Sequence, residues 1–301
     1  MHLADYNSHM DRNMKKILIL GGTRFFGRAL IGKLLETEGV PSDIVCFHRG
    51  FHQAGFPFPG VSHIIGDRYD ESAVSALFEK TWDLVIDLSG TEWGMISTAV
   101  QSAQGRCGRY VFISSSSVYS TQGPLPHRED EPLLSGTGEA YALAKIRGEQ
   151  LIKELFPHYT IIRPSKVYGP GNYYFSEQSF LQMLQNRREL VLKNDPILHF
   201  TYIDDLTRGI AALLETDGIF NVAGAEPAGL SRFIELIGEL HGIRVQFRFG
   251  NTSDVLFSSL DDRILDLSAA KEAVGWAPVV SLHEGLMKTF GMPAEHIKGD
   301  E

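Results

Sequence analysis

The first 165 residues alternate short apolar runs with helical patterns, and this alternation limits the possible folds more than any other feature of the sequence. Runs typical of buried strands lie at 16–20, 43–47, 62–65, 83–89, 110–115 and 159–164. Stretches with helical spacing of apolar residues lie between them, at 26–36, 71–80, 96–103 and 141–155. Strand–helix–strand units of this kind join parallel strands through right-handed crossovers. The sequence therefore predicts an α/β fold with a parallel sheet flanked by helices.

The first apolar run leads into a glycine turn, LGGTRFFG at 20–27, which opens an amphipathic helix. Glycines suit a backbone that must approach the pyrophosphate of a dinucleotide, and the N-terminus of the next helix supplies N–H donors. The spacing departs from the GxGxxG fingerprint because Arg24 takes the middle place. The order of strand, turn and helix still predicts a Rossmann, doubly wound sheet. The expected cofactor-binding residues of the turn are Gly21, Gly22, Thr23, Arg24, Phe25, Phe26 and Gly27.

The second predicted strand ends in CFHRG, where an NAD site would carry an acidic residue for the ribose 2′-hydroxyl. His48 and Arg49 stand there instead. An arginine fork matches a 2′-phosphate, so Arg24 and Arg49 are expected to close on one phosphate, unless both are solvated surface residues. The sequence therefore favours NADP over NAD. After the third strand, Asp67 either bonds the adenine amino group or forms an Asx turn.

Tyr141 and Lys145 stand four residues apart in the helical stretch 141–155, hence one turn apart on the same face. A nearby cation favours the phenolate of a tyrosine, whose ordinary pKa of about 10 makes it a poor base at neutral pH. Such a tyrosine can exchange a proton with a substrate hydroxyl while hydride moves to or from a nicotinamide. The spacing alone is weak evidence, because chance produces it easily.

A run of four serines, Ser114 to Ser117, begins at the end of the strand run at 110–115, on the side of the sheet where open α/β folds bind ligands. One of these hydroxyls is a candidate partner for Tyr141. The alternative to a catalytic role is hydrogen bonding within a turn, and four consecutive serines cannot all be catalytic.

Composition excludes several classes of function. The net charge is −9 and the basic residues form no runs, so we expect no nucleic-acid partner. Cys46 and Cys107 lack the spacing of a metal or redox pair, which indicates a reducing cytoplasm. His48 and His52 have the spacing of a helical metal pair, but Gly50 interrupts it, and no metal site is expected. No nucleophile elbow or P-loop is present.

The sequence shows no membrane span and no signal peptide. Residues 1–13 read as a vector-derived leader, with the native start at Met10 or Met14. An acidic run, Glu129 to Glu131, lies between prolines and reads as a solvated loop or, less simply, as a lid over the substrate.

Taken in order, the glycine turn, the serines before Val118-Tyr119, the YxxxK helix and IIRPSKVYGPGN at 161–172 resemble an extended short-chain dehydrogenase/reductase of the nucleotide-sugar epimerase/dehydratase type. The late segments FTYIDDL, FNVAG and LDLSAAKEAVGWAP resemble that family too, so the likeness runs from about Lys15 to Leu286. The GGTRF turn resembles a divergent branch of the family.

Two short late runs, HFTYI at 199–203 and GIFNVAG at 218–224, look like strands that rejoin the sheet or its edge, so the sequence predicts a dinucleotide-binding domain at 14–164 plus about 199–224. A smaller substrate-binding lobe, built from insertions, would take about 165–198 and 225–292. The resemblance implies Tyr141 as the acid/base, Lys145 as its activator, and Ser115 as the catalytic hydroxyl with Ser116 as the alternate. The further residues it assigns are Asp67, Leu88, Ser89, Pro164 and Lys166 for the cofactor, and Asn172 and Arg263 for the substrate.

The resemblance also implies a homodimer through the helix after Gly94 and the Tyr141 helix. The expected function is an NAD(P)-dependent oxidoreductase or epimerase acting on a nucleotide-activated sugar or similar hydroxylated small molecule, by C4-type epimerisation or keto reduction. Dehydratases of the family carry Asp-Glu directly after the catalytic hydroxyl; Ser116 and Ser117 stand there and disfavour a 4,6-dehydratase. The alternative is a non-catalytic dinucleotide-sensing or RNA-associated protein on the same fold.

Overall fold

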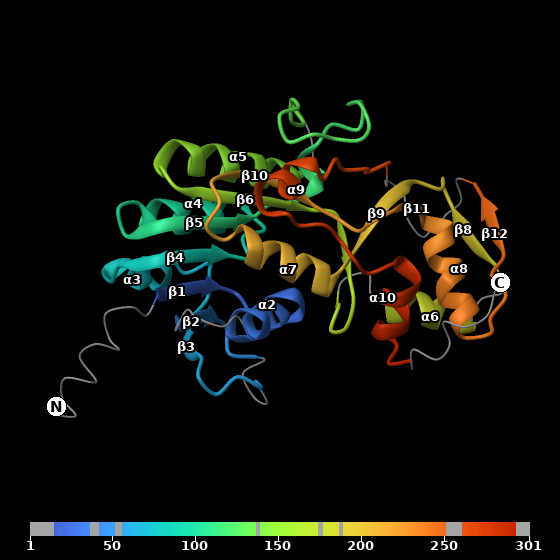
Figure 1. Cartoon of the computed structure of the whole chain (residues 1–301), viewed down its shortest axis with the longest axis horizontal. Coiled ribbons are helices and arrows are strands. Elements are labelled where there is room, and N and C mark those ends of the chain that lie inside the picture. Colours follow the sequence, from blue (N-terminus) through green and yellow to red (C-terminus); the bar gives the residue numbers. More distant parts are fainter. Residues whose placement is uncertain are drawn as a thin grey trace. The chain divides into compact units, whose positions relative to one another are not determined.

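The computed structural model describes residues 15–36, 42–51, 56–136, 139–173, 177–186, 189–250 and 261–292 (Figure 1). The expected leader and His52 lie outside these ranges. The chain divides into two compact units. Unit 1 takes 1–118, 133–163 and 210–220, and unit 2 takes 119–132, 164–209 and 221–301.

A seven-stranded sheet forms the centre of unit 1. Its strands are β1 (Lys15–Leu20), β2 (Ser42–His48), β3 (Ser62–Ile65), β4 (Trp82–Asp87), β5 (Cys107–Ile113), β6 (Tyr159–Pro164) and β10 (Gly218–Val222). They lie in the order β10-β6-β5-β4-β1-β2-β3, and the β1–β2, β2–β3, β1–β4, β4–β5 and β5–β6 pairs are parallel. The order reverses between β1 and β4, the switch point at which open α/β sheets bind ligands. The predicted doubly wound sheet is confirmed.

Helices cover both faces of this sheet because its strands are apolar on both sides. The helices are α2 (Phe25–Glu36), α3 (Glu71–Ala76), α4 (Trp93–Ala103) and α5 (Ala140–Leu155), with a 3-10 turn η1 at Leu77–Glu79. On one face α3, α4 and α5 pack in a single core with strand residues such as Leu18, Phe47, Val85 and Phe112. On the other face α2 buries Ile31 against the β1 and β2 side chains.

Unit 2 holds two small sheets and most of the remaining helices. One sheet has the order β11-β9-β7 and the other pairs β12 with β8. The strands are β7 (Lys166–Tyr168), β8 (Leu190–Leu192), β9 (Ile197–Tyr202), β11 (Pro227–Gly229) and β12 (Phe247–Phe249). The helices are α6 (Glu177–Asn186), α8 (Leu230–Leu240), α9 (Ser268–Val274), α10 (Leu282–Thr289) and the first part of α7 (Ile203–Leu213).

The two late strand runs behave differently. GIFNVAG forms β10 and joins the main sheet as expected, whereas the run 199–203 lies in β9 and does not. β9 pairs in parallel with β7, in the register Lys166↔Phe200, and antiparallel with β11. Its buried Phe200 stacks on Phe233 of α8, with ring centroids 4.2 Å apart. The apolar face of β9 is thus covered within unit 2, which places 199–209 there and not in the dinucleotide-binding unit.

The described helices include none that is both long and apolar enough to cross a bilayer.

Candidate active site

Tyr141 and Lys145 occupy the first two turns of α5, as predicted. The Tyr141 side chain is partly exposed, whereas Lys145 is buried. The Lys145 ammonium donates a 2.6 Å hydrogen bond to the carbonyl of Ile113 and lies 4.6 Å from the centroid of the Phe112 ring and 5.6 Å from that of Tyr141. Burial lowers the pKa of Lys145 to about 8, although the carboxylates of Asp87 and Glu149 oppose this. A cation is therefore held beside the Tyr141 ring.

The four serines have different surroundings. Ser114 is buried and donates a 2.5 Å hydrogen bond to Glu149. Ser115 is half-buried; its Oγ donates to Ser117 Oγ at 3.1 Å and accepts from the Ser117 N–H at 3.1 Å. Ser116 is buried in the short 3-10 helix η2 (Ser116–Val118). Ser114 is therefore a structural residue, and Ser115 is the more accessible of the two candidates that the sequence left open.

The glycine turn has the backbone that a close-approaching ligand needs. Gly21 and Gly22 have φ of +106° and +100°, a region in which L side chains are rare. A Cβ on Gly27 would lie 2.8 Å from the Gly22 Cα, so the start of α2 packs directly on the turn. The Gly21 N–H donates to the carbonyl of Phe47 at 2.9 Å, which ties the turn to β2. Phe25, the first residue of α2, has a φ of +44°.

At the end of β2, His48 is buried and Arg49 is exposed. His48 Nδ1 accepts the Gly50 N–H at 3.0 Å, so its Nε2 carries the proton and donates to Nδ1 of His63 at 2.8 Å. The Arg49 guanidinium lies 5.5 Å from the centroid of the Phe51 ring. Arg24 is exposed at the start of α2. Both predicted arginines thus stand at the carboxyl edge of the sheet, on the β1 and β2 ends.

The other predicted cofactor residues of unit 1 also follow strand ends. Asp67 accepts the Tyr69 N–H at 3.0 Å, which is the Asx turn that the sequence allowed. Ser89 Oγ donates to the Leu20 carbonyl at 3.0 Å, and a Cβ on Gly21 would lie 3.1 Å from the Cβ of Ser89. A Cβ on Gly27 would lie 3.2 Å from the Leu88 side chain. Leu88 and Ser89 therefore form the wall of the glycine turn.

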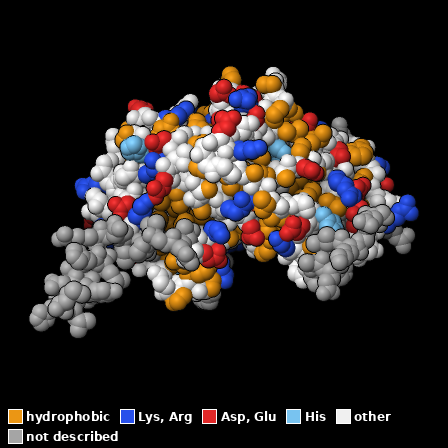
Figure 2. All heavy atoms as spheres, in the orientation of Figure 1, with side chains coloured by type: hydrophobic (Ala, Val, Ile, Leu, Met, Phe, Trp, Pro, Cys, Tyr) orange, Lys and Arg blue, Asp and Glu red, His pale blue; other side chains and the backbone are white. Residues whose placement is uncertain are grey.

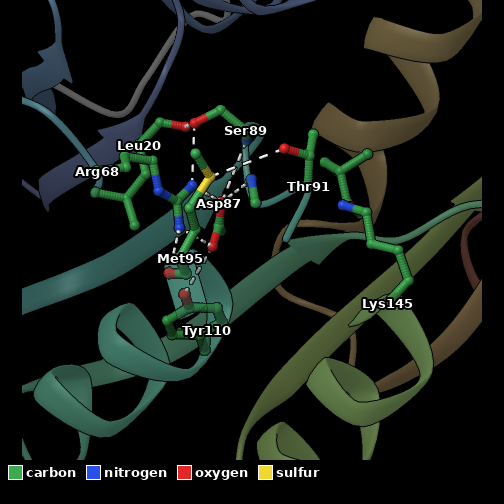
Figure 3. A network of polar contacts seen from close by, with 10 residues as sticks. Leu20, Arg68, Asp87, Ser89, Thr91, Met95, Tyr110 and Lys145 are labelled. Atoms are coloured by element: carbon green, nitrogen blue, oxygen red, sulfur yellow. Dashed lines mark hydrogen bonds and ion pairs between the residues drawn. The ribbon is translucent and has the colours of Figure 1, made fainter. Parts of the chain in front are cut away.

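Sequence reasoning missed a buried ion pair beside this wall. Asp87, the last residue of β4, forms a two-pronged pair with Arg68 from the loop after β3, one prong of which is 2.8 Å long (Figure 3). Asp87 also accepts the N–H groups of Ser89 and Gly90 at 3.2 and 3.0 Å and the Tyr110 hydroxyl at 3.1 Å. Burial alone would raise the pKa of the Asp87 carboxyl, but Arg68 holds it below its ordinary value. The sequence signal for this pair was Asp87 itself, a charged residue at the end of the apolar run DLVID, because a buried charge needs a partner.

A second buried pair was also missed, and it contacts Ser114, the first residue of the serine run. Arg163 of β6 donates to Glu149 of α5 through Nε at 3.0 Å and Nη2 at 2.6 Å, and both side chains are buried. Ser114 adds a third hydrogen bond to the same carboxylate. This pair ties α5, the helix that carries Tyr141, to the sheet beneath it.

Four predicted residues lie in unit 2. Pro164 is buried at the end of β6, and Lys166 begins β7. Asn172 Nδ2 donates to the buried Glu177 carboxylate at 3.1 Å. Burial raises the pKa of Glu177 and lowers that of Lys166, and the two groups attract each other. Arg263 donates to the carbonyl of Tyr119 at 3.1 Å.

The acidic run is only in part the solvated loop that the sequence suggested, because Glu129 and Glu131 are half-buried. Glu129 accepts the Asn221 N–H at 2.7 Å, and Glu131 accepts from His127 Nδ1 and the Arg128 N–H at 3.1 and 2.9 Å. Only Asp130 of the three is strongly exposed. The segment is anchored because these carboxylates satisfy backbone groups within unit 2.

Comparison with known proteins agrees with this architecture. The model of the NAD dependent epimerase/dehydratase family matches residues 17–223. The chain therefore belongs to the NAD dependent epimerase/dehydratase family.

Three similar proteins show the range of the likeness. The chloroplast stem-loop binding protein of 41 kDa b from Arabidopsis thaliana is 28% identical over 92% of this chain and 79% of its own length. The UDP-glucuronate 4-epimerase of Thermodesulfobacterium geofontis is 30% identical over 63% of this chain and 60% of its own length. The crystal structure of UDP-glucuronic acid 4-epimerase from Bacillus cereus, in complex with UDP-glucuronic acid and NAD, superimposes with a TM-score of 0.76 at 22% identity, covering 92% of this chain and 98% of that one.

Proposed function

We propose that this protein is an NAD(P)-dependent epimerase or reductase acting on a nucleotide-activated sugar or a similar hydroxylated substrate. The observation that carries the proposal is the Tyr141–Lys145 pair on α5, with a buried ammonium 5.6 Å from the phenol ring. Burying an amine costs free energy unless its charge is used or paired, so the buried Lys145 supports a role for this charge beside Tyr141.

In this proposal Tyr141 exchanges the proton of the reacting substrate hydroxyl. The Lys145 ammonium beside the ring favours the phenolate, which is the form of Tyr141 that accepts the proton. Ser115 orients the reacting oxygen, because it follows the end of β5 and is more accessible than Ser116, while Ser114 is committed to Glu149. Ser116 remains the alternate.

The glycine turn fits a dinucleotide. Gly21 and Gly22 have positive φ, and a Cβ on them would lie 3.1 Å from Ser89 and 3.0 Å from Ile31, so only glycine suits this tight turn. The first N–H groups of α2 lack intrahelical acceptors. Residues 21–27, Leu88 and Ser89 would hold the pyrophosphate, with Asp67 and His48 nearer the adenosine end and Pro164 and Lys166 nearer the nicotinamide. When bound, the nicotinamide supplies the hydride acceptor and donor that the protein itself lacks.

We propose NADP in preference to NAD. The exposed guanidinium groups of Arg24 and Arg49 at the ends of β1 and β2 suit a 2′-phosphate, and the second strand ends in no carboxylate for a free ribose hydroxyl. Asn172 and Arg263 are proposed substrate contacts of unit 2. A 4,6-dehydratase is disfavoured because Ser116 and Ser117 offer no acid–base pair for eliminating water.

The first experiment is mass spectrometry of the nucleotides that acid releases from freshly purified protein, together with titration of NAD and NADP into the emptied protein. Exchangeable NADP that binds more tightly than NAD supports a reductase and the roles of Arg24 and Arg49. Tightly held NAD in near-equal ratio to protein supports an epimerase, which returns its hydride to the same substrate, and contradicts the arginine assignment. Failure of both nucleotides to bind contradicts the proposed function.

A stem-loop binding activity is a second candidate, because one long relative carries that name. The net charge of −9 argues against it, as does the surface: on the face in Figure 2, the described Lys and Arg side chains are interspersed with acidic ones and form no continuous basic patch. RNA binding measured between 50 and 200 mM salt would test it. A steep loss of affinity with salt would support RNA binding, and no binding at the lower salt would reject it.

We further propose a homodimer through α4 and α5. These helices pack on each other, since a Cβ on Gly148 would lie 2.8 Å from the Ile96 side chain, and Trp93 at the start of α4 remains exposed. Light scattering on the purified chain measures the oligomeric state. We also propose a reducing, cytoplasmic location, because both described cysteines are free and burial raises their thiol pKa values to about 12.

A further inference from the structure

The buried Arg68–Asp87 pair is surrounded by further hydrogen bonds at the end of β4. Replacing a buried ion pair by apolar side chains of similar size is often neutral or stabilising, so such a pair is weak evidence for a stability role. Here the Asp87 carboxylate accepts hydrogen bonds from Arg68, Tyr110 and the N–H groups of Ser89 and Gly90. A carboxylate with this many donors is fixed in place as well as kept ionised.

The Arg68 guanidinium is also held by several hydrogen bonds. Beyond Asp87 it donates to Ser89 Oγ at 3.0 Å and to the Met95 carbonyl in the first turn of α4 at 3.1 Å. Ser89 in turn donates to the Leu20 carbonyl at the end of β1. Two opposite charges are therefore held rigidly between the glycine turn and the start of α4.

Lys145 lies close to these charges, because its ammonium is 4.6 Å from the centroid of the Phe112 ring and Phe112 pairs in register with Asp87 on the neighbouring strand β4. Figure 3 shows its side chain rising from α5 with its amino end turned toward Thr91 and the network around Asp87. The charged groups that act on the ammonium are Asp87 from β4, Arg68 from the loop after β3, and Glu149 from α5 itself. Tyr110 of β5, also in the network, stays neutral because burial and the neighbouring Asp87 raise the pKa of its phenol well above the ordinary value.

We propose that Arg68 and Asp87 are positioning residues that set the charge of the Lys145 ammonium, with Asp87 favouring the charged form and Arg68 opposing it. The inference rests on the proposed function of Lys145 and assigns it a control that the Tyr–Lys spacing does not reveal. Of the two residues Asp87 has the larger effect. The pair therefore favours, on balance, the ammonium that Tyr141 needs.

The test is a pH titration of Lys145 itself, which needs no substrate. Protein labelled with carbon-13 at lysine Cε is followed by NMR from pH 6 to 11, and the Lys145 signal is assigned by its loss in Lys145→Arg. Asp87→Asn is expected to lower the Lys145 midpoint by about one pH unit and Arg68→Met to raise it by about half a unit. Tyr110→Phe is the matched control, because it removes a hydrogen bond to Asp87 without changing any charge, and its midpoint should stay within about 0.2 unit of the original.

Opposite shifts in the two charge variants, with no shift in the control, support the proposal. Equal midpoints, or shifts of the same sign in both variants, overturn it, because a purely structural role gives no reason for opposite signs. If a single variant does not fold, Arg68→Met with Asp87→Leu removes both charges; the midpoint should then fall by less than about one unit, and an unchanged midpoint overturns the proposal. Opposite shifts in a protein that turns over no nucleotide sugar would contradict the proposed function and leave this inference standing.

Discussion

The Lys145 ammonium lies 5.6 Å from the centroid of the Tyr141 ring while it donates a 2.6 Å hydrogen bond to the Ile113 carbonyl. The bond fixes the end of a long side chain that would otherwise sample many rotamers. The first two turns of α5 thus present a partly exposed phenol and a buried cation, and most of the predictions below follow from that arrangement.

Removing the Tyr141 hydroxyl should abolish proton exchange and leave cofactor binding near normal. For Tyr141→Phe we expect turnover to fall by roughly 10²- to 10⁴-fold, because that is the usual contribution of a positioned acid or base. Tyr159→Phe is the control, because Tyr159 is the first residue of β6 and so lies at the amino-terminal ends of the parallel strands, away from the proposed site. Steady-state kinetics and cofactor titration measure both effects. Retained turnover in Tyr141→Phe would remove Tyr141 from the mechanism.

The serines should separate into a structural and a catalytic residue. Ser114→Ala should lower the free energy of unfolding by about 1–3 kcal/mol, because it takes a donor from the buried Glu149 carboxylate. Ser115→Ala should reduce turnover with little change in stability. Urea unfolding and kinetics on both variants distinguish the two roles. If Ser116→Ala impairs turnover more than Ser115→Ala does, the catalytic hydroxyl is Ser116.

The buried lysine should give opposite pH trends in activity and stability. Burial lowers the pKa of Lys145 to about 8, against about 10.4 in an unfolded chain. Activity should therefore decline as pH rises through 8 and the ammonium is lost. Between pH 8 and about 10.4 the unfolded state binds more protons than the folded state, so the Lys145 contribution to stability rises with pH, by about 3 kcal/mol in total.

Urea unfolding at pH 7.5 and 9.5 measures this trend. Lys145→Met should flatten the pH dependence of stability, whereas Lys153→Met, which removes an exposed lysine of the same helix, should leave it unchanged. Equal pH dependence in the protein and in Lys145→Met would show that Lys145 has an ordinary pKa.

The close contact between Gly27 and Gly22 should make the glycine turn intolerant of a methyl group. Gly27→Ala would place a Cβ 2.8 Å from the Gly22 Cα, so we expect a loss of about 1–3 kcal/mol in stability and weaker dinucleotide binding. Gly94→Ala is the matched control, because Gly94 lies in α4 and the added Cβ would have no atom within 4 Å apart from its chain neighbours and the backbone of its own helix. It should be neutral or stabilising by up to about 1 kcal/mol. Thermal unfolding with and without dinucleotide reads both outcomes.

Cofactor preference should depend on Arg49. Arg49→Ala is expected to weaken NADP binding by about tenfold and to leave NAD binding nearly unchanged, because only NADP carries the 2′-phosphate. Arg28→Ala removes another exposed arginine, from the first turn of α2, and should affect the binding of neither nucleotide. Fluorescence titration with both nucleotides makes the comparison, and equal losses for NAD and NADP would contradict the assignment.

The fold class and the Tyr141–Lys145 pair were readable from the sequence because both depend on short-range periodicity. Strand runs, helix spacing and a glycine turn repeat over a few residues, and an i, i+4 pair lies on one helix face wherever the helix packs. The correct elements therefore appeared in the correct order, and the seven-stranded sheet confirmed their arrangement.

Only the tertiary structure decided which distant residues pair. β9 has a strand pattern like that of β10, yet its neighbours are β7 and β11, because Phe200 is covered by Phe233 of the second core. Asp87 and Arg68 are 19 residues apart, and Glu149 and Arg163 are 14 apart. The strand order brings these residues together, and a buried charge needs an opposite charge as its partner. Neither the strand order nor the burial can be predicted from the residues next to each charge.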